Sequence, residues 1–509
     1  THDGKSYLDY DEEEIRRKFT ISTSIAPIPY GNYKINLLDT SGHPDFIGDT
    51  IATMYAAETA LFVVDAVEGP QVMTTKLWQT AADMKISRAV FINHIDRENA
   101  NFDISMATLH ARFGSRLVPL TIPIGVQEDF QGVVDIVRMK ARYFDKGGIV
   151  ERVEDIPAEY ADAAQNARER LVDNVAEADE ELMMKYLDGE PLSQEEIEDL
   201  LGKAINQELI VPVYVGSTII KQGIQGLMED ICTFFPHPRQ HCAYALADDA
   251  GKISIDETGE PGGFVFKTVA DQFVGRLSYV KVLSGVLEPG QDLINARTGK
   301  KDRVGHLYIM MGQESNDVKS AKAGDIIIIP KLTDTRPGDT LSLSGKVKLA
   351  PMPIPTPQYP IAIEAANKKE EDKLGAFLAR VAENDPTILV RRDEETHQTV
   401  VTTMGDEQIN TMLNRLKSQV GIEVKIVPVR VPYRETIRTV AEAQGRHKKQ
   451  TGGSGQFGDC WLRLEPNPGG GYEFIDEIVG GHIPRAYIPA VDKGVREAMA
   501  EGFLAGYPM

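Results

Sequence analysis

The sequence predicts a multidomain α/β protein, with a doubly wound parallel-sheet domain first, an all-β domain next and α+β segments last. The chain has 509 residues, whereas single hydrophobic cores stop growing at about 250–300 residues. Short apolar runs alternate with helical patterns at the N-terminal end and again beyond residue 355. Between these regions, β-rich segments are separated by Gly and Pro turns.

The first domain is expected over residues 1–240. Short apolar runs that read as buried strands occupy residues 35–39, 60–65, 88–92 and 210–215. Loops and helical patterns follow these runs, and this alternation is typical of parallel strands joined by crossover helices. The region is therefore predicted to be a doubly wound α/β sheet.

An inserted subdomain is expected between the third and fourth of these strands. Residues 151–206 are acidic and rich in helical patterns. The interval is far longer than an ordinary connection within a compact domain. We therefore predict an inserted helical subdomain over about residues 112–206.

Further domains follow the α/β region. Residues 241–352 begin with a polar, turn-rich linker and continue as short strands, which predicts a β barrel or sandwich. Prolines between residues 350 and 360 mark the next boundary. Strands and helices alternate again over residues 356–428, and a last segment covers residues 429–509.

Composition limits the classes of function. The formal net charge is -21, so any contact with nucleic acid must be local. No apolar run is long enough to span a membrane. Cys232, Cys242 and Cys460 lack metal-ligand spacing, which argues against zinc and disulfides and favours a reducing compartment. We expect a soluble, cytoplasmic protein without a membrane partner.

The first candidate motif follows the strand at residues 35–39. It has the form Asp-x-x-Gly-His and consists of Asp39, Thr40, Ser41, Gly42 and His43. A carboxylate at a strand end can hold Mg²⁺ through water, and a glycine lets the backbone approach a phosphate. The histidine would then be placed to orient an attacking water. The alternative is an ordinary turn.

The second motif follows the strand at residues 88–92 and consists of Asn93, His94, Ile95 and Asp96. A carboxylate can accept both N–H groups on the guanine edge, whereas adenine presents a different edge. The imidazole of His94 could stack on the base. Considered alone, the tetrapeptide is better explained as a solvated loop.

The third motif, Gly216, Ser217 and Thr218, follows the strand at residues 210–215. A backbone N–H in this loop could donate to the guanine O6. Each motif is weak by itself. All three are expected at strand ends along one edge of a parallel sheet, where ligands of such sheets bind.

These motifs resemble Asp-Thr-Pro-Gly-His, Asn-Lys-Met-Asp and Gly-Ser-Ala of elongation factor G, in the same order. The resemblance extends over essentially the whole chain. It implies a P-loop-type GTPase sheet with an inserted subdomain, a β-barrel second domain, a ferredoxin-like third domain and part of a fourth α+β domain. It also implies that the protein binds GTP with Mg²⁺ and hydrolyses the GTP on the ribosome.

The resemblance also assigns residues. The stretch Lys18, Phe19, Thr20 and Ile21 is similar to the Gly-Ile-Thr-Ile switch of the family, which makes Thr20 a Mg²⁺ ligand together with Asp39. His43 becomes the residue that orients water. The two later motifs, through Asn93, His94, Asp96, Ser217 and Thr218, become the guanine site.

A basic cluster lies in the last segment, at Arg446, His447, Lys448 and Lys449. By composition it is either a solvated loop or an RNA contact. The cluster and the later Arg485 resemble the tip loops of the fourth domain in the family. The resemblance therefore implies contact with a ribosomal complex of rRNA, tRNA and mRNA, made by a factor that is monomeric away from the ribosome.

The sequence departs from the family pattern at Ser41, His94 and Ser454, which predicts an elongation-factor-G-like paralogue. No Gly-x-x-x-x-Gly-Lys-Ser/Thr motif occurs in the printed sequence. We therefore expect a fragment that is itself inactive, from a protein with a phosphate-binding loop upstream.

For the whole protein we expect GTP-driven movement of tRNA and mRNA. The alternatives are a ribosome-protection or ribosome-recycling GTPase of the same family, and a non-hydrolysing ribosome-binding paralogue. A metabolic GTP-dependent enzyme would leave the barrel and the basic tip unexplained.

Overall fold

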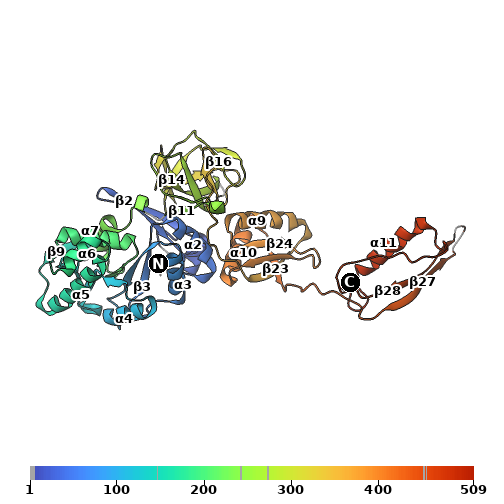
Figure 1. Ribbon diagram of the computed structural model, residues 1–509, viewed down its shortest axis with the longest axis horizontal. Coiled ribbons are helices and arrows are strands. Elements are labelled where there is room, and N and C mark those ends of the chain that lie inside the picture. The colour runs from blue at the N-terminus through green and yellow to red at the C-terminus, as the bar shows by residue number, and fades with distance from the viewer. Residues whose placement is uncertain (1–5, 146, 241–242, 272–273, 451–452, 454) are drawn as a thin grey trace. The chain divides into compact units, whose positions relative to one another are not determined.

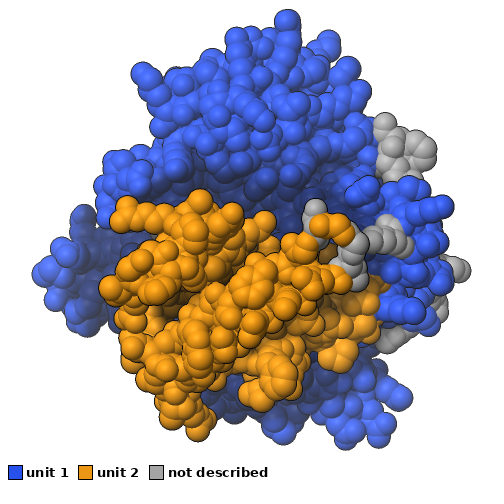
Figure 2. Space-filling view, turned by 90° about the vertical axis from the view of Figure 1, so that its right-hand side faces the viewer, with its two compact units in different colours: residues 1–360, 365–390, 401–425 blue, residues 361–364, 391–400, 426–509 orange. Residues whose placement is uncertain are grey.

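The computed structural model describes residues 6–145, 147–240, 243–271, 274–450, 453 and 455–509 (Figure 1). Cys242 and Ser454 lie outside the described residues. The chain divides into two compact units, which Figure 2 colours separately. The first contains residues 1–360, 365–390 and 401–425, and the second contains residues 361–364, 391–400 and 426–509.

A four-stranded parallel sheet forms the centre of the N-terminal domain, in the order β3-β4-β10-β5. Its strands are β3 (Thr59–Asp65), β4 (Ser87–Asn93), β10 (Val211–Val215) and β5 (Leu117–Pro119). The associated helices are α2 (Ile47–Ala56), α3 (Val72–Asp83), α4 (Phe102–Phe113) and α8 (Ile224–Phe234). Strands β4 and β10 are buried throughout. The predicted α/β fold class is confirmed.

One strand prediction is wrong. Residues 35–39 belong to β2 (Tyr33–Asp39), which pairs antiparallel with β1 (Ser24–Tyr30) in a separate two-stranded sheet. No side chain of β2 is fully buried. A two-residue turn sets this pairing, with Gly31 at φ 55° in its first position, which is a typical hairpin connection. The apolar run was therefore mistaken for a buried parallel strand.

The inserted region differs from the helical subdomain that we expected. It begins with β5 of the parallel sheet and continues with an antiparallel sheet in the order β6-β7-β8-β9. Those strands are β6 (Thr121–Ile124), β7 (Gly132–Asp135), β8 (Lys140–Phe144) and β9 (Val150–Glu154). The expected helices follow as α5 (Ala158–Ala176), α6 (Glu180–Leu187) and α7 (Gln194–Asn206). Their apolar stripes, including Leu171 and Leu200, join one buried cluster with β10.

An all-β domain follows, as predicted. Its main sheet has the order β17-β16-β22-β13-β14-β21-β18-β19. The strands of this region are β11 (Tyr244–Ala245), β12 (Lys252–Ile253), β13 (Gly262–Asp271), β14 (Gly275–Ser284), β15 (Val286–Leu287), β16 (Asp292–Asn295), β17 (Lys301–Arg303), β18 (Leu307–Met311), β19 (Glu314–Val318), β20 (Ala321–Lys322), β21 (Ile326–Pro330) and β22 (Thr340–Ser342). A register shift in β13, between Val265 and Lys267, marks a bulge at Phe266.

The next elements alternate as β-α-β-β-α-β, which is the ferredoxin-like order. They are β23 (Tyr359–Ala365), α9 (Glu371–Asn384), β24 (Leu389–Arg392), β25 (Thr399–Thr403), α10 (Asp406–Val420) and β26 (Val424–Val427). The C-terminal part consists of β27 (Ala441–Lys449), β28 (Gln456–Leu464) and α11 (Ile488–Met499). Near the N-terminus lies one short helix, α1 (Glu12–Arg17). Within the described residues, no helix has the length and apolar character needed to cross a membrane.

Candidate functional site

The ends of β4 and β10 hold the second and third motifs together. The Thr218 N–H donates to Asn93 Oδ1 at 2.9 Å, and Asn93 Nδ2 donates back to Thr218 Oγ1 at 3.1 Å. These strands are adjacent and parallel, so their carboxyl ends meet at one edge of the sheet. We call Asn93, His94, Asp96, Ser217 and Thr218 the base corner.

Main-chain bonds fix the base corner further. The Gly216 N–H donates to the Ile92 carbonyl at 3.0 Å, and the Ser217 N–H donates to the Gln222 carbonyl at 2.9 Å. A Cβ on Gly216 would lie 2.4 Å from the Gln222 oxygen, so this close approach requires glycine. The backbone N–H groups of Gly216, Ser217 and Thr218 are thus all used inside the protein.

Two buried polar atoms of the base corner lack a partner. Asp96 Oδ1 and Ser217 Oγ are shielded from solvent and make no hydrogen bond within the described structure. Buried polar groups are normally satisfied, and an unpaired one costs about 1–3 kcal/mol. Asp96 Oδ1 can accept a hydrogen bond and the Ser217 hydroxyl can donate one, and the two lie in loops that follow adjacent strands. Guanine offers partners for both, because its N–H groups can donate and its O6 can accept.

His94 is anchored to a residue that the sequence analysis missed. His94 Nδ1 lies 2.8 Å from Asp65 Oδ2, at the end of β3, and Arg97 Nη1 donates to the same oxygen at 2.9 Å. Burial opposes ionisation of Asp65. The hydrogen bonds from His94 and the Val67 backbone, with the Arg97 charge, nevertheless lower the pKa of Asp65 to about 2. A stable carboxylate therefore orients the imidazole ring of His94, whose backbone is left-handed at φ 64°.

Asp9 interacts with both Thr20 and Asp39. Thr20 Oγ1 donates to Asp9 Oδ1 at 2.8 Å. Burial raises the pKa of Asp39 to about 6, and the charge of Asp9 adds to this rise. Two carboxylates and a hydroxyl in this arrangement suit a hard divalent cation, which takes oxygen ligands and would relieve the repulsion. Among the described residues, no group of three or more His, Cys, Asp or Glu side chains has metal-binding geometry.

His43 lies against aromatic rings in the same region. Its ring stacks on Phe19 with centroids 5.4 Å apart, and Phe46 lies at 5.7 Å. Its Nδ1 accepts the Asp45 N–H at 3.2 Å. That bond leaves Nε2 available, and about a third of the side chain is exposed. We call Asp9, Phe19, Thr20, Asp39 and His43 the switch cluster.

A lysine of the β barrel holds the segment that follows Thr20. Lys267 Nζ donates to Ser22 Oγ at 2.5 Å and to the Thr23 carbonyl at 2.8 Å, and it lies 3.3 Å from Asp49 Oδ2. The Thr23 N–H donates to the same Asp49 carboxylate at 2.5 Å. The Lys267 side chain is 6% exposed. This buried cation therefore ties the chain after Thr20 to α2.

The switch cluster and the base corner do not meet. No hydrogen bond, ion pair or ring contact in the described part of the chain joins them. We expected all three motifs along one sheet edge, but β2 lies outside the parallel sheet. Only the second and third motifs share that edge.

The basic cluster lies on β27, and it is a strand rather than the loop that composition had left open. The register pairs Arg446 with Asp459, His447 with Gly458, Lys448 with Phe457 and Lys449 with Gln456. All four basic residues are exposed. Arg485 begins a short 3-10 helix ahead of α11 and is also exposed.

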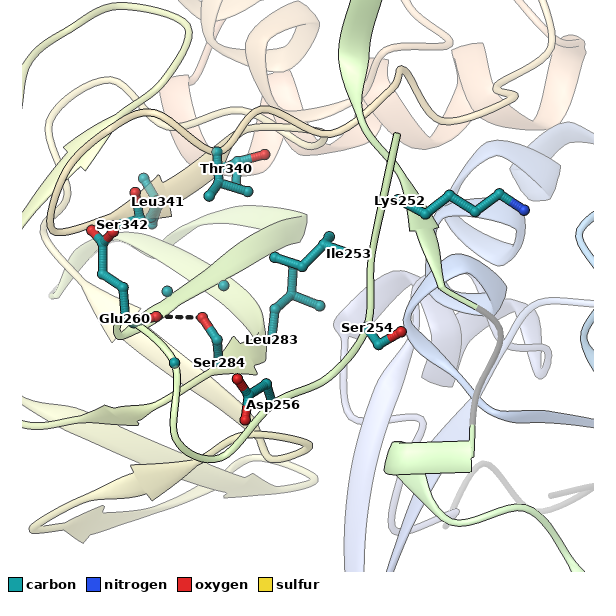
Figure 3. A pocket seen from close by; sticks show the side chains of 14 residues that line it. Lys252, Ile253, Ser254, Asp256, Glu260, Leu283, Ser284, Thr340, Leu341 and Ser342 are labelled. Carbon is teal, nitrogen blue, oxygen red and sulfur yellow. Dashed lines mark hydrogen bonds between the residues drawn. The ribbon is translucent and has the colours of Figure 1, made fainter. Parts of the chain in front are cut away.

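A hollow in the barrel contains none of the predicted site residues. It has a volume of about 440 Å³ and is lined by Ile253, Asp256, Glu260, Ser284 and Thr340 among others (Figure 3). Its carboxylates are used locally, because Asp256 Oδ1 accepts the Thr258 N–H at 2.9 Å and Glu260 accepts the Ser344 N–H. The hollow adds nothing to the candidate site.

Of the residues missed from sequence, Asp65 carried a usable signal, because it too ends a parallel strand. Asp9 and Lys267 carried no such signal, because each interacts with residues that are distant in the sequence.

Four family models match successive parts of the chain. They are the elongation factor Tu GTP binding domain at residues 1–237, elongation factor G domain 2 at residues 260–344, elongation factor G domain III at residues 354–428 and elongation factor G domain IV at residues 429–509.

Relatives agree with this assignment. An elongation factor G-like protein of Thermotoga maritima is 39% identical over 508 residues, which cover 99% of this chain and 74% of that protein. A crystal structure from Thermus thermophilus superposes with a TM-score of 0.83 at 32% identity, over 99% of this chain and 74% of its own. The resemblance noted from the sequence is thereby confirmed, and the chain belongs to the elongation factor G family of translational GTPases.

Proposed function

We propose that this chain belongs to a GTPase that moves tRNA and mRNA through the ribosome. The observation that carries the proposal is the buried, unpartnered Oδ1 of Asp96, which follows the strand that ends at Asn93, the hydrogen-bond partner of Thr218. Such a corner favours a ligand that brings N–H donors. We further propose a GTP-binding domain at residues 1–240, a barrel at 241–352, and α+β domains at 356–428 and 429–509.

In the base corner, Asp96 accepts the guanine N–H groups and the Ser217 hydroxyl donates to O6. The pair of Asn93 and Thr218 supports the loop from behind, and His94, oriented by Asp65, covers a face of the base. In the same pose adenine presents an unprotonated N1 and a C–H at C2 in place of these N–H groups, so it leaves Asp96 Oδ1 unpaired. The Asp96 carboxylate thus sets the preference for guanine.

In the switch cluster, Thr20 and Asp39 would hold Mg²⁺, and Thr40, Ser41 and Gly42 would line the phosphate end. When bound, Mg²⁺ would neutralise charge on the phosphates. His43 orients the attacking water through Nε2, because Nδ1 is used by Asp45. Phe19 and Phe46 hold the ring and exclude bulk water from one side.

The exposed cations Arg446, His447, Lys448, Lys449 and Arg485 contact ribosomal RNA, tRNA or mRNA. Such contacts are electrostatic and local on a chain whose net charge is -21. The protein would act as a cytoplasmic monomer that presents this end to the ribosome.

The test is made in the full-length protein, which is expected to carry the phosphate-binding loop. It compares Asp96→Asn with the unsubstituted parent in ribosome-stimulated hydrolysis of GTP and of xanthosine triphosphate. An amide offers an N–H where the carboxylate offered an oxygen, and xanthine carries an oxygen where guanine carries an amino group. We expect apparent GTP affinity to fall about 30- to 1000-fold, which corresponds to roughly 2–4 kcal/mol. Xanthosine triphosphate should become the better substrate.

The matched control is Asp83→Asn, an exposed carboxylate on α3, which should change neither value. Equal GTP affinity in the Asp96 variant and the parent would contradict the guanine site. Absence of ribosome-stimulated turnover in the unsubstituted full-length protein would contradict the translational role. Primer extension on a bound mRNA reports movement in the same reactions.

A further inference from the structure

We propose that one face of the β27–β28 hairpin is a stacking platform for unpaired RNA bases, with Phe457 and Trp461 as the stacking rings. This inference rests on the proposed function, because it specifies the kind of RNA that the basic end binds. The hairpin lies wholly within the second compact unit.

Both rings are exposed. Phe457 is 67% exposed and Trp461 is 68% exposed. Large aromatic side chains normally bury their area, so two open rings on one strand call for a ligand that covers them. They are four residues apart on β28, which places them on the same face about 13 Å from one another.

Cations share that face. Directly opposed residues of an antiparallel pair lie on the same side of the sheet. The register opposes Lys448 to Phe457, Arg446 to Asp459 and Gln444 to Trp461. The Arg446 guanidinium lies 5.8 Å from the Phe457 ring centroid, and its nearest carboxylate, Asp459, is 3.7 Å away. Lys448 makes no ion pair within the described residues. The face therefore combines aromatic rings with available positive charge.

The other face has a different character. Near the turn it carries the exposed His447 and Lys449, and farther along it carries Ala443, Gly445 and Gly458 with the partly buried Cys460 and Leu462. Small and aliphatic side chains of this kind suit packing inside the protein. Phe457 and Trp461 thus share one face with Arg446 and Lys448, whereas His447 and Lys449 lie on the opposite face.

Unpaired RNA is the ligand that fits this combination. Every base presents a π face to an aromatic ring, and the backbone phosphates are attracted to the lysine and arginine. In a duplex the bases stack on one another and cannot reach the two rings. An aliphatic protein surface would gain nothing from the cations.

Intrinsic fluorescence tests the proposal directly, because the chain has two tryptophans. Trp78 is 7% exposed and stacks on Phe113 with centroids 4.3 Å apart. In a Trp78→Phe protein, emission comes from Trp461. Titration with a single-stranded oligouridine of about 12 nucleotides should quench this emission in a saturable manner that weakens with salt.

Binding measured by filter retention should fall about 5- to 100-fold in Trp461→Leu and in Phe457→Leu, which matches about 1–3 kcal/mol for each stacked base. The control is Leu464→Ala, an exposed apolar residue on the opposite face. It should bind as the parent does. A duplex of the same length should bind more weakly and should not quench Trp461.

Unchanged affinity in both aromatic variants, with no quenching, would overturn the platform. If a Lys448→Gln, Lys449→Gln variant still loses affinity in that case, the RNA contact of the proposed function survives without stacking. No binding of RNA by any form would overturn both. Quenching by duplex and single strand alike, or by a protein partner alone, would also overturn the platform.

Discussion

The base corner and the switch cluster lie in one domain but are held in different ways. Hydrogen bonds between the ends of adjacent strands β4 and β10 fix the base corner. The chain that follows Thr20 depends instead on a charged side chain, Lys267, which reaches it from the barrel. The base corner is thus held in place by bonds within its own sheet. The position of residues 22 and 23, beside the switch cluster, depends instead on a side chain of the neighbouring barrel domain. We therefore expect mutation to separate the proposed binding of the base from the proposed response of the switch.

The largest effect is expected from Lys267→Met. The change leaves Asp49 without its cation and removes two hydrogen bonds from Ser22 and Thr23. Loss of one partner of a buried pair typically costs about 3–5 kcal/mol. We expect the free energy of opening of residues 22–24, measured by native-state hydrogen exchange, to fall by about this amount. The affinity of the base corner for guanine nucleotide should not change.

Lys281→Met is the matched control. Lys281 is another buried barrel lysine. It forms an ion pair with Glu58 at 2.6 Å and makes no bond to residues 22–24 that the described structure shows. Its loss should leave exchange at residues 22–24 unchanged. Equal loss of protection in the two variants would show that general contact with the barrel, rather than Lys267, holds the segment.

A second effect concerns the sheet behind the base corner. Tyr214 of β10 donates to Asp230 Oδ2 at 3.2 Å, and Arg138 lies 3.0 Å from Asp230 Oδ1. Burial raises the pKa of Asp230 to about 7, and Asp135 adds to the rise against the opposing charge of Arg138. Between about pH 4 and pH 7, Asp230 is protonated in the folded state but ionised in the unfolded state. The free energy of unfolding therefore falls as the pH rises through this range.

We expect this group to contribute a loss of roughly 2 kcal/mol between pH 5 and pH 7. Urea unfolding followed by Trp78 emission in a Trp461→Phe background reports this domain. Asp230→Asn should remove that part of the pH dependence. A pH dependence that is identical in Asp230→Asn and the parent would assign the effect to other carboxylates.

The smallest effect is expected from Thr218→Val. Valine keeps the shape of threonine but loses the acceptor for Asn93 Nδ2. The loss of one hydrogen bond costs about 1 kcal/mol, so nucleotide affinity should fall about fivefold while exchange at residues 22–24 stays the same. Thr80→Val on α3 is the control, since that hydroxyl bonds only within its helix. A change in the exchange of residues 22–24 would show that the two regions are coupled.

The sequence predicted the base corner because parallel strands necessarily bring their carboxyl ends together. It failed at β2, since an apolar run does not reveal whether its partner is parallel or antiparallel. The two-residue turn at Gly31 and Asn32 was the signal for the hairpin. The insertion was misjudged because its acidic helices dominate its composition, whereas β6 to β9 are short.

The contact of Lys267 with Ser22 and Thr23 could not be predicted from the local sequence pattern. It joins residues 245 positions apart, and it requires a barrel strand with an irregular register. Sequence periodicity reports which face of a strand is buried, but it does not report which domain covers that face.

The bulge at Phe266 constrains how these domains can be exchanged in evolution or by recombination. Without the extra residue, β13 would pair with β14 without a shift from Gly263 onward, and side chain 267 would turn to the opposite face of its sheet. A barrel taken from a protein with a regular strand would then point its lysine away from Asp49, even if every amino acid type were retained. We therefore expect the two domains to be exchangeable only as a matched pair, because the length of strand β13 decides where Lys267 points.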